Sequence, residues 1–89
     1  MSGARTIVFA PEAAKEFDVL DTTVRDRIEK ALDQLAMDPL ALKNQIKRLK
    51  GDSGMRLRVG DWRIIFDVRR AEIVILAIAH RREIYRAEP

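Results

Sequence analysis

The sequence has 89 residues, 47% hydrophobic and 35% charged, which suits one folded soluble domain and is too short for a catalytic domain plus a regulatory one. It has no cysteine and one histidine, which excludes disulfides and thiolate metal sites and argues against a histidine-based one. We therefore expect a single domain over residues 1–89 with no cofactor and no metal. Since residues 1–5 lead into a strand-like run without a long apolar segment, we also expect a cytoplasmic protein with no membrane partner.

The first part of the chain predicts one strand and two helices. Residues 5–10 favour a strand, and Pro11 then stands at a position that a helix start tolerates, which predicts a helix over residues 11–20. A second helix is expected from about residue 23, because Thr23 and Asp26 resemble a capping box. Its apolar stripe is formed by Val24, Ile28, Leu32 and Leu35, and it ends at Asp38-Pro39. The two helices predict a helical hairpin packed on a sheet.

The second part of the chain predicts a meander of strands. Residues 40–54 have no clear period and stay unassigned, apart from a loop at residues 51–54. From Met55 the period of hydrophobic residues becomes two, which predicts three antiparallel strands at 55–59, 62–69 and 72–79. The predicted fold class is therefore α+β, in the order β-α-α-β-β-β, with an N-terminal strand, a helical hairpin and a C-terminal three-stranded antiparallel meander.

The charge is distributed unevenly along the chain. Residues 1–42 hold five Lys/Arg and eight Asp/Glu, whereas residues 43–89 hold twelve and six. Phosphate contacts supply most of the non-specific affinity of proteins for nucleic acid, so the C-terminal half is a candidate polyanion-binding region. The alternative interpretation is an ordinary solvated basic surface.

Three arginines are expected to share one face of the meander. A tight turn at Gly60-Asp61 pairs Arg58 with Arg63 and places both, with Arg56, opposite the core face. Like charges directly opposite each other are destabilising, and a bound anion would relieve them. The rest of the predicted register places Ile73, Ile75, Ala77 and Ala79 on the core face and Ile65, Val74, Leu76, Ile78 and His80 on the arginine face.

The apolar members of that face allow two interpretations. Either they form the floor of a concave basic site, or they pack under the C-terminal tail or a partner with the arginines as rim charges. The tail itself, HRREIYR at residues 80–86, places a histidine, three arginines and the only tyrosine together. Arginine forms fixed forks to phosphate, and histidine and tyrosine can transfer protons, so the density of these residues indicates a site for phosphate chemistry.

Three segments together resemble the RelE/ParE toxin superfamily: LKG at residues 49–51, MRLRVGDWRIIF at 55–66 and IAHRREIYR at 78–86. The predicted order of elements and the length agree over nearly the whole chain. The resemblance implies a RelE-like, microbial-ribonuclease-like fold and a toxin of a type II toxin–antitoxin system. It also implies one of two activities, since RelE-like toxins cut messenger RNA on the ribosome and ParE-like toxins inhibit DNA gyrase.

The resemblance to the RelE-like branch implies a set of site residues. The catalytic candidates are Arg56, Arg63, His80, Arg81 and Tyr85, with His80 the first choice for proton transfer and Tyr85 the second; Asp61 and Glu83 stay open as bases. The candidates for RNA or ribosome binding are Lys43, Lys47, Arg48, Lys50, Arg58, Arg82 and Arg86. Gly54 stands where the family has a second basic strand residue, and the tail segment is shorter than in the best-known RelE.

The function favoured by this resemblance is a ribosome-dependent mRNA endoribonuclease that needs no metal, because the 2′-hydroxyl of the RNA is its nucleophile. The expected partners are the ribosome, mRNA and a cognate antitoxin protein that covers the basic surface. The alternative is a ParE-like inhibitor of DNA gyrase, which acts by protein contact without catalysis. A degenerate toxin or another nucleic-acid-binding module is the remaining interpretation.

Overall fold

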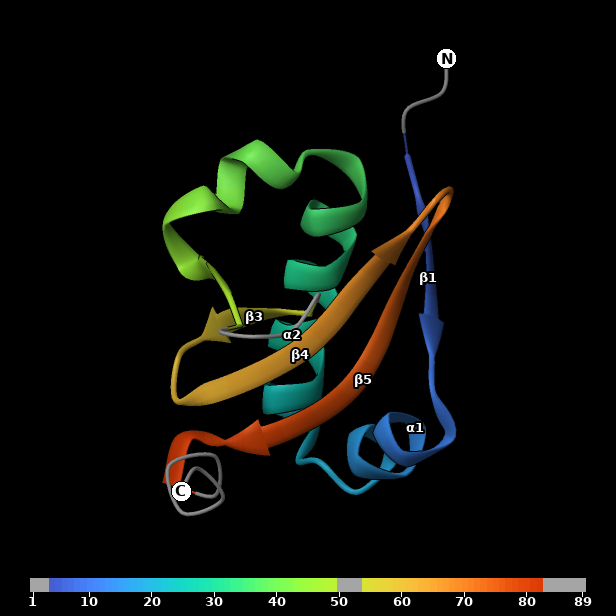
Figure 1. The fold of residues 1–89 in the computed structure, drawn as a ribbon. Coiled ribbons are helices and arrows are strands. Elements are labelled where there is room, and N and C mark those ends of the chain that lie inside the picture. The colour runs from blue at the N-terminus through green and yellow to red at the C-terminus, as the bar shows by residue number, and fades with distance from the viewer. Residues whose placement is uncertain (1–3, 50–53, 83–89) are drawn as a thin grey trace.

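The computed structural model describes residues 4–49 and 54–82. In these residues one mixed sheet is covered by two α-helices, and Figure 1 shows helix α2 behind the central strands. The elements follow in the order β1 (Thr6–Phe9), α1 (Pro11–Asp18), α2 (Thr22–Met37), the 3-10 helix η1 (Pro39–Gln45), β2 (Ile46–Arg48), β3 (Met55–Val59), β4 (Trp62–Arg69) and β5 (Glu72–His80).

The sheet has the strand order β1-β5-β4-β3-β2. The predicted α+β class and the order of strand, helical hairpin and antiparallel meander are confirmed. The stretch that the sequence left unassigned forms η1 and β2, and β2 pairs antiparallel with β3. The first strand pairs parallel with β5, so it extends the meander at its other edge.

The helix boundaries differ slightly from the expected ones. Pro11 stands in the first turn of α1 as predicted, but this helix ends at Asp18. The capping box predicted from Thr23 and Asp26 is wrong. Helix α2 begins one residue earlier, and its N-cap is Asp21, whose carboxylate accepts a hydrogen bond from the Thr23 N–H at 3.1 Å. An aspartate in this position satisfies a free amide of the first turn as well as a threonine does.

The core lies between the helices and one face of the sheet. Ile28, Leu32 and Leu35 of α2 are buried as their spacing predicts, and the strands contribute Leu57, Ile64, Phe66, Ile73, Ile75 and Ile78. No polar or charged residue is buried in the part of the chain that the structure describes. Burying each of these large side chains stabilises the fold by about 1.5–3 kcal/mol, so this face holds the domain together.

The register of β3 on β4 is the predicted one, with Arg58 opposite Arg63 and Val59 opposite Trp62. The next hairpin differs, because β5 has a bulge: Phe66 pairs with Ile75, but the preceding residue Ile65 pairs with Ala77. Leu76 is therefore an extra residue on β5. A bulge shifts the alternation of side chains by one residue, which a count along the sequence cannot detect.

The bulge overturns the predicted faces for the second half of β5. Ile78 belongs to the core and is 3% exposed, whereas Ala77 and Ala79 lie opposite Ile65 and Arg63 on the arginine face. His80 lies opposite Trp62, so its predicted place on the arginine face is also wrong.

Helix α1 is tied to this irregular part of β5. The first strand pairs only with the Glu72–Ile75 half of β5, and the chain then turns into α1. Beyond that point the N–H of Ile78 donates to Oε1 of Glu16 at 2.7 Å. A charge-assisted hydrogen bond thus replaces the missing strand neighbour at this edge.

Candidate functional site

The outer face of the sheet, opposite the helices, concentrates positive charge at one end. Four of its side chains, Lys47 of β2, Arg56 and Arg58 of β3 and Arg63 of β4, form what we call the basic cluster. The sheet register places Lys47 directly opposite Arg56 and Arg58 directly opposite Arg63. Two like-charged pairs on one face lower the stability of the sheet, so this arrangement favours a bound polyanion.

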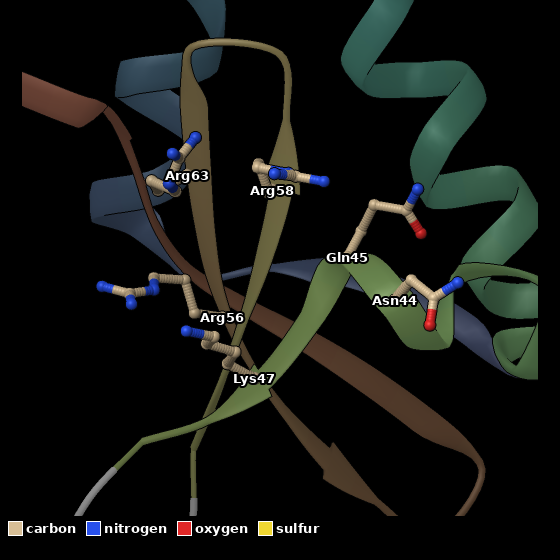
Figure 2. A pocket seen from close by; sticks show the side chains of 6 residues that line it. All are labelled: Asn44, Gln45, Lys47, Arg56, Arg58 and Arg63. Carbon is tan, nitrogen blue, oxygen red and sulfur yellow. The ribbon is translucent and has the colours of Figure 1, made fainter.

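The basic cluster lines a hollow of about 190 Å³, together with the amide side chains of Asn44 and Gln45. Figure 2 shows the four cationic side chains on the strands and the two amides on the η1 side. None of these lining residues is acidic. The hollow therefore offers cationic and amide hydrogen-bond donors to an anion, which suits a phosphate group of a nucleic acid.

Arg63 is held in place by the turn between β3 and β4. Its Nη1 donates to the carbonyl oxygens of Gly60 and Trp62, both at 3.0 Å. Gly60 has φ +61°, a left-handed conformation that glycine adopts without strain. Arg63 is half-buried, and a guanidinium with two backbone acceptors is oriented before any ligand arrives, which lowers the entropic cost of binding.

Arg81, the other predicted catalytic arginine, reaches the same turn from the end of β5. Its backbone N–H donates to the carbonyl oxygen of Asp61 at 2.8 Å, and its Nη1 lies 3.9 Å from Oδ1 of Asp61. Its side chain does not line the hollow. The fold thus brings Arg63 and Arg81 to one turn, although they are 18 positions apart in the sequence.

The structure does not bring the His80 ring together with the basic cluster. The ring makes an edge contact with Trp62, with ring centroids 5.4 Å apart, and its Nδ1 accepts a hydrogen bond from the Arg82 N–H at 3.3 Å. Trp62 packs against the core. His80 and Arg63 therefore project to opposite faces of the sheet, and a direct proton transfer in the hollow is not the role that this position favours.

The predicted binding residues are dispersed. Lys47 and Arg58 line the hollow, whereas Arg48 alternates to the other face of β2 and Lys43 lies exposed on η1. Arg82 is exposed just after β5. The remaining predicted residues, Lys50, Tyr85 and Arg86, and the possible base Glu83, lie outside the described residues.

Three polar residues beside the hollow were missed by sequence reasoning. Asn44 and Gln45 belong to the segment without a recognisable period, and neither carries a charge that would have marked it. Oε1 of Gln45 is buried and has no hydrogen-bond partner among the described residues. Arg27 of α2, which reads as an ordinary solvated helix residue, lines a second, shallow groove of about 540 Å³ that adjoins the hollow at Gln45 and Arg58.

Two broader features of the described part of the chain concern metals and membranes. No group of three or more His, Cys, Asp or Glu side chains in residues 4–49 and 54–82 is arranged to hold a metal ion. In the same residues, no helix combines the length and the apolar character needed to cross a membrane.

The sequence matches the model of a protein family described as the ParE toxin of the type II toxin–antitoxin system parDE, over residues 7–85. Since this match spans most of the chain, the protein belongs to the RelE/ParE superfamily of type II toxins. No curated protein matches the sequence.

Solved structures of such toxins have the same fold. The RelB–RelE antitoxin–toxin complex from Methanococcus jannaschii is similar at 28% identity and a TM-score of 0.74, covering 92% of this chain and 99% of that chain. The archaeal RelE–RelB complex from Pyrococcus horikoshii OT3 matches at 23% identity and a TM-score of 0.74, covering 88% and 96%. The intact E. coli RelBE toxin–antitoxin complex matches at 22% identity and a TM-score of 0.71, covering 86% and 96%. The predicted RelE-like fold is thereby confirmed.

Proposed function

We propose that this toxin is an mRNA endoribonuclease that acts on the ribosome and uses the basic cluster as its phosphate site. The observation that carries the proposal is the hollow lined by Lys47, Arg56, Arg58 and Arg63 without an acidic residue. A surface that binds its target by protein contact alone does not need two like-charged pairs facing each other. A phosphate that gains negative charge during cleavage does need them.

The proposed reaction is an attack of the RNA 2′-hydroxyl on the adjacent phosphorus. The O2′–P bond forms, the P–O5′ bond breaks, and the products carry a 2′,3′-cyclic phosphate and a 5′-hydroxyl. One group must accept the 2′-hydroxyl proton and another must protonate the leaving O5′. Arg56, Arg63 and Arg81 stabilise the charge that develops on the non-bridging oxygens, and no metal is needed for this chemistry.

The placement of His80 changes the order of the proton-transfer candidates. Its ring faces Trp62 on the helix side of the sheet, so we assign the proton transfer to Tyr85 in preference to His80. Tyr85→Phe is then expected to lower cleavage by about 10²–10³-fold, and His80→Ala by much less. Oδ1 of Asp61 lies 3.9 Å from Nη1 of Arg81, which leaves Glu83 as the other candidate base.

The proposed partners follow from the same surface. Lys47 and Arg58 in the hollow would hold the RNA and ribosomal backbone, and the other proposed binding residues are Lys43, Arg48, Lys50, Arg82 and Arg86. A cognate antitoxin is the second proposed partner, because related toxins were solved as complexes with theirs. Half-buried Ile65 and Leu76 offer it apolar contacts, but Ile78 is in the core and is not available. The proposed location is the cytoplasm, where ribosomes and messages are found.

One observation favours a second function, the inhibition of DNA gyrase: the family whose model matches is described as the ParE toxin. In that case the protein acts by contact with the enzyme and performs no phosphate chemistry. Single substitutions such as Arg63→Ala or Tyr85→Phe would then leave most of its toxicity intact.

The test compares both targets with the same protein preparations. Purified protein is added to a reconstituted translation reaction with stalled ribosomes, and message ends are mapped by primer extension beside a gyrase supercoiling assay. Arg63→Ala and Arg56→Ala are tested against Lys30→Ala, which removes one positive charge from the exposed face of α2. Cuts in the decoding site that only the two cluster substitutions suppress support the nuclease, whereas intact message with blocked supercoiling identifies a gyrase inhibitor.

A further inference from the structure

Backbone carbonyl oxygens at the turn between β3 and β4 accept hydrogen bonds from two arginines. Gly60 and Trp62 accept hydrogen bonds from the side chain of Arg63, and the residue between them, Asp61, accepts one from the backbone N–H of Arg81. This last bond continues the pairing of β4 with β5 by one residue beyond Trp62 and His80. Three consecutive residues therefore hold the side chain of Arg63 and the backbone of Arg81 at the same turn.

The negative charge of Asp61 contrasts with the positive charge of the residues around it. Among the residues that line the hollow and the adjoining groove, five are cationic and Asp61 is the only acidic one. A carboxylate beside a phosphate site repels the ligand, so a neutral turn residue would serve binding better. The contact that explains it is Oδ1 of Asp61 at 3.9 Å from Nη1 of Arg81, with side chains 68% and 54% exposed.

We propose that Asp61 is a positioning residue that orients the Arg81 guanidinium toward the phosphate held by Arg63. This inference rests on the nuclease function proposed above. At 3.9 Å and with both groups exposed, the ion pair is weak, so Arg81 can exchange the carboxylate for a substrate phosphate at little cost. The carboxylate keeps the flexible side chain near its place of action while the site is empty, which reduces the entropy lost in the transition state.

The decisive substitution is Asp61→Asn, which keeps the size of the side chain and removes its charge. Its matched control is Asp67→Asn, which makes the same change of charge within β4 but breaks the 3.2 Å contact with Arg69 instead. In cleavage of ribosome-bound message, Asp61→Asn lowers kcat about tenfold while KM stays equal or falls, because Arg81 is misplaced and the repulsion is gone. Asp67→Asn leaves kcat unchanged.

A double-mutant cycle with Arg81→Ala separates positioning from a general effect on the turn. Arg81→Ala weakens binding of a 2′-deoxy oligonucleotide analogue, which cannot be cleaved, about fivefold when Asp61 is present and less than twofold in the Asp61→Asn background. The kcat values should show the same coupling: the double variant should have the same kcat as Arg81→Ala alone. A purely structural role of Asp61 would make the two effects multiply.

The outcomes distinguish this inference from the function on which it rests. Suppose that the wild-type protein cleaves. If the fold-effects of Asp61→Asn and Arg81→Ala then multiply, or if Asp61→Asn behaves like Asp67→Asn, the pairing of Asp61 with Arg81 has no positioning role and the nuclease function stands. If the wild-type protein binds the analogue with the expected coupling but never cleaves, the nuclease is wrong and the positioning role in binding stands. Failure to bind and to cleave overturns both.

Discussion

The two faces of the sheet differ in character, although the same strands form both: one face is apolar and covered by helices, and the other carries a cluster of cationic side chains. On the helix-covered face, Leu57, Ile64 and Phe66 are at most 1% exposed and belong to the apolar core. On the outer face, the residues that alternate with them include Arg56, Arg58 and Arg63, which meet other cations across the strands. Strands β3 and β4 thus stabilise the domain with the residues of one face and contribute to like-charged pairs on the other. The difference points to the outer face as the binding surface, because a bound anion would offset the repulsion within these pairs.

The largest expected effect tests the covered face. Phe66→Ala removes a ring that is 1% exposed and leaves a cavity between α2 and the sheet. It should lower the free energy of unfolding by about 3–5 kcal/mol, measured by urea denaturation followed by circular dichroism. Val68→Ala on the same strand, where the side chain is 36% exposed, is the control and should cost much less. Equal losses would mean that the core is not where the structure places it.

The next effect concerns the outer face and activity. Arg63→Ala should lower the rate of message cleavage by about 10²–10³-fold, because it removes a preoriented donor to the developing charge. The free energy of unfolding should change little or rise, since a like-charged neighbour of Arg58 disappears. Parallel cleavage and denaturation measurements check both statements. A large loss of stability would show that Arg63 serves the fold instead of the site.

A third prediction tests the bulge of β5, beyond which the alternation of core-facing and outward-facing residues is shifted by one. Glu16→Ala removes the acceptor of the Ile78 N–H beside the bulge of β5 and should destabilise the domain by about 1–3 kcal/mol. Lys15→Ala, a change at an exposed neighbouring position of α1, should be close to neutral. Hydrogen exchange of the Ile78 amide gives the local reading. Unchanged protection of this amide in Glu16→Ala would contradict the contact.

The smallest effect isolates the cost of the like charges. Arg58→Glu turns the pair with Arg63 into one of opposite charge and should stabilise the domain by about 0.2–1 kcal/mol. The same change should weaken RNA binding severalfold, and the stability gain should fade at high salt. Thermal unfolding at two salt concentrations measures the first effect. A loss of stability at low salt would mean that the basic cluster is not under electrostatic strain.

The sequence predicted the fold correctly in segments where the hydrophobic residues followed a single helical or strand periodicity. The apolar stripe of α2, the glycine turn and the β3–β4 register followed from spacing alone, and so did the convergence of Arg56, Arg58 and Arg63. The predicted alternation of side chains along β5 failed at Leu76, because a bulge within an unbroken apolar run has no recognisable sequence signal. That single residue moved His80 away from the arginines. Asn44 and Gln45 were missed because their place beside the basic cluster depends on the path of η1, which has no periodic signal.

The most direct test of this division between the faces is a titration of isotope-labelled protein with the 2′-deoxy oligonucleotide analogue, followed through backbone amide chemical shifts. If the outer face binds RNA, the largest changes should occur at Lys47, Arg56, Arg58, Arg63 and Arg81, and the amides of the exposed face of α2 should stay unchanged. Changes confined to the helices, or spread evenly over the surface, would contradict the claim that the outer face of the sheet binds RNA.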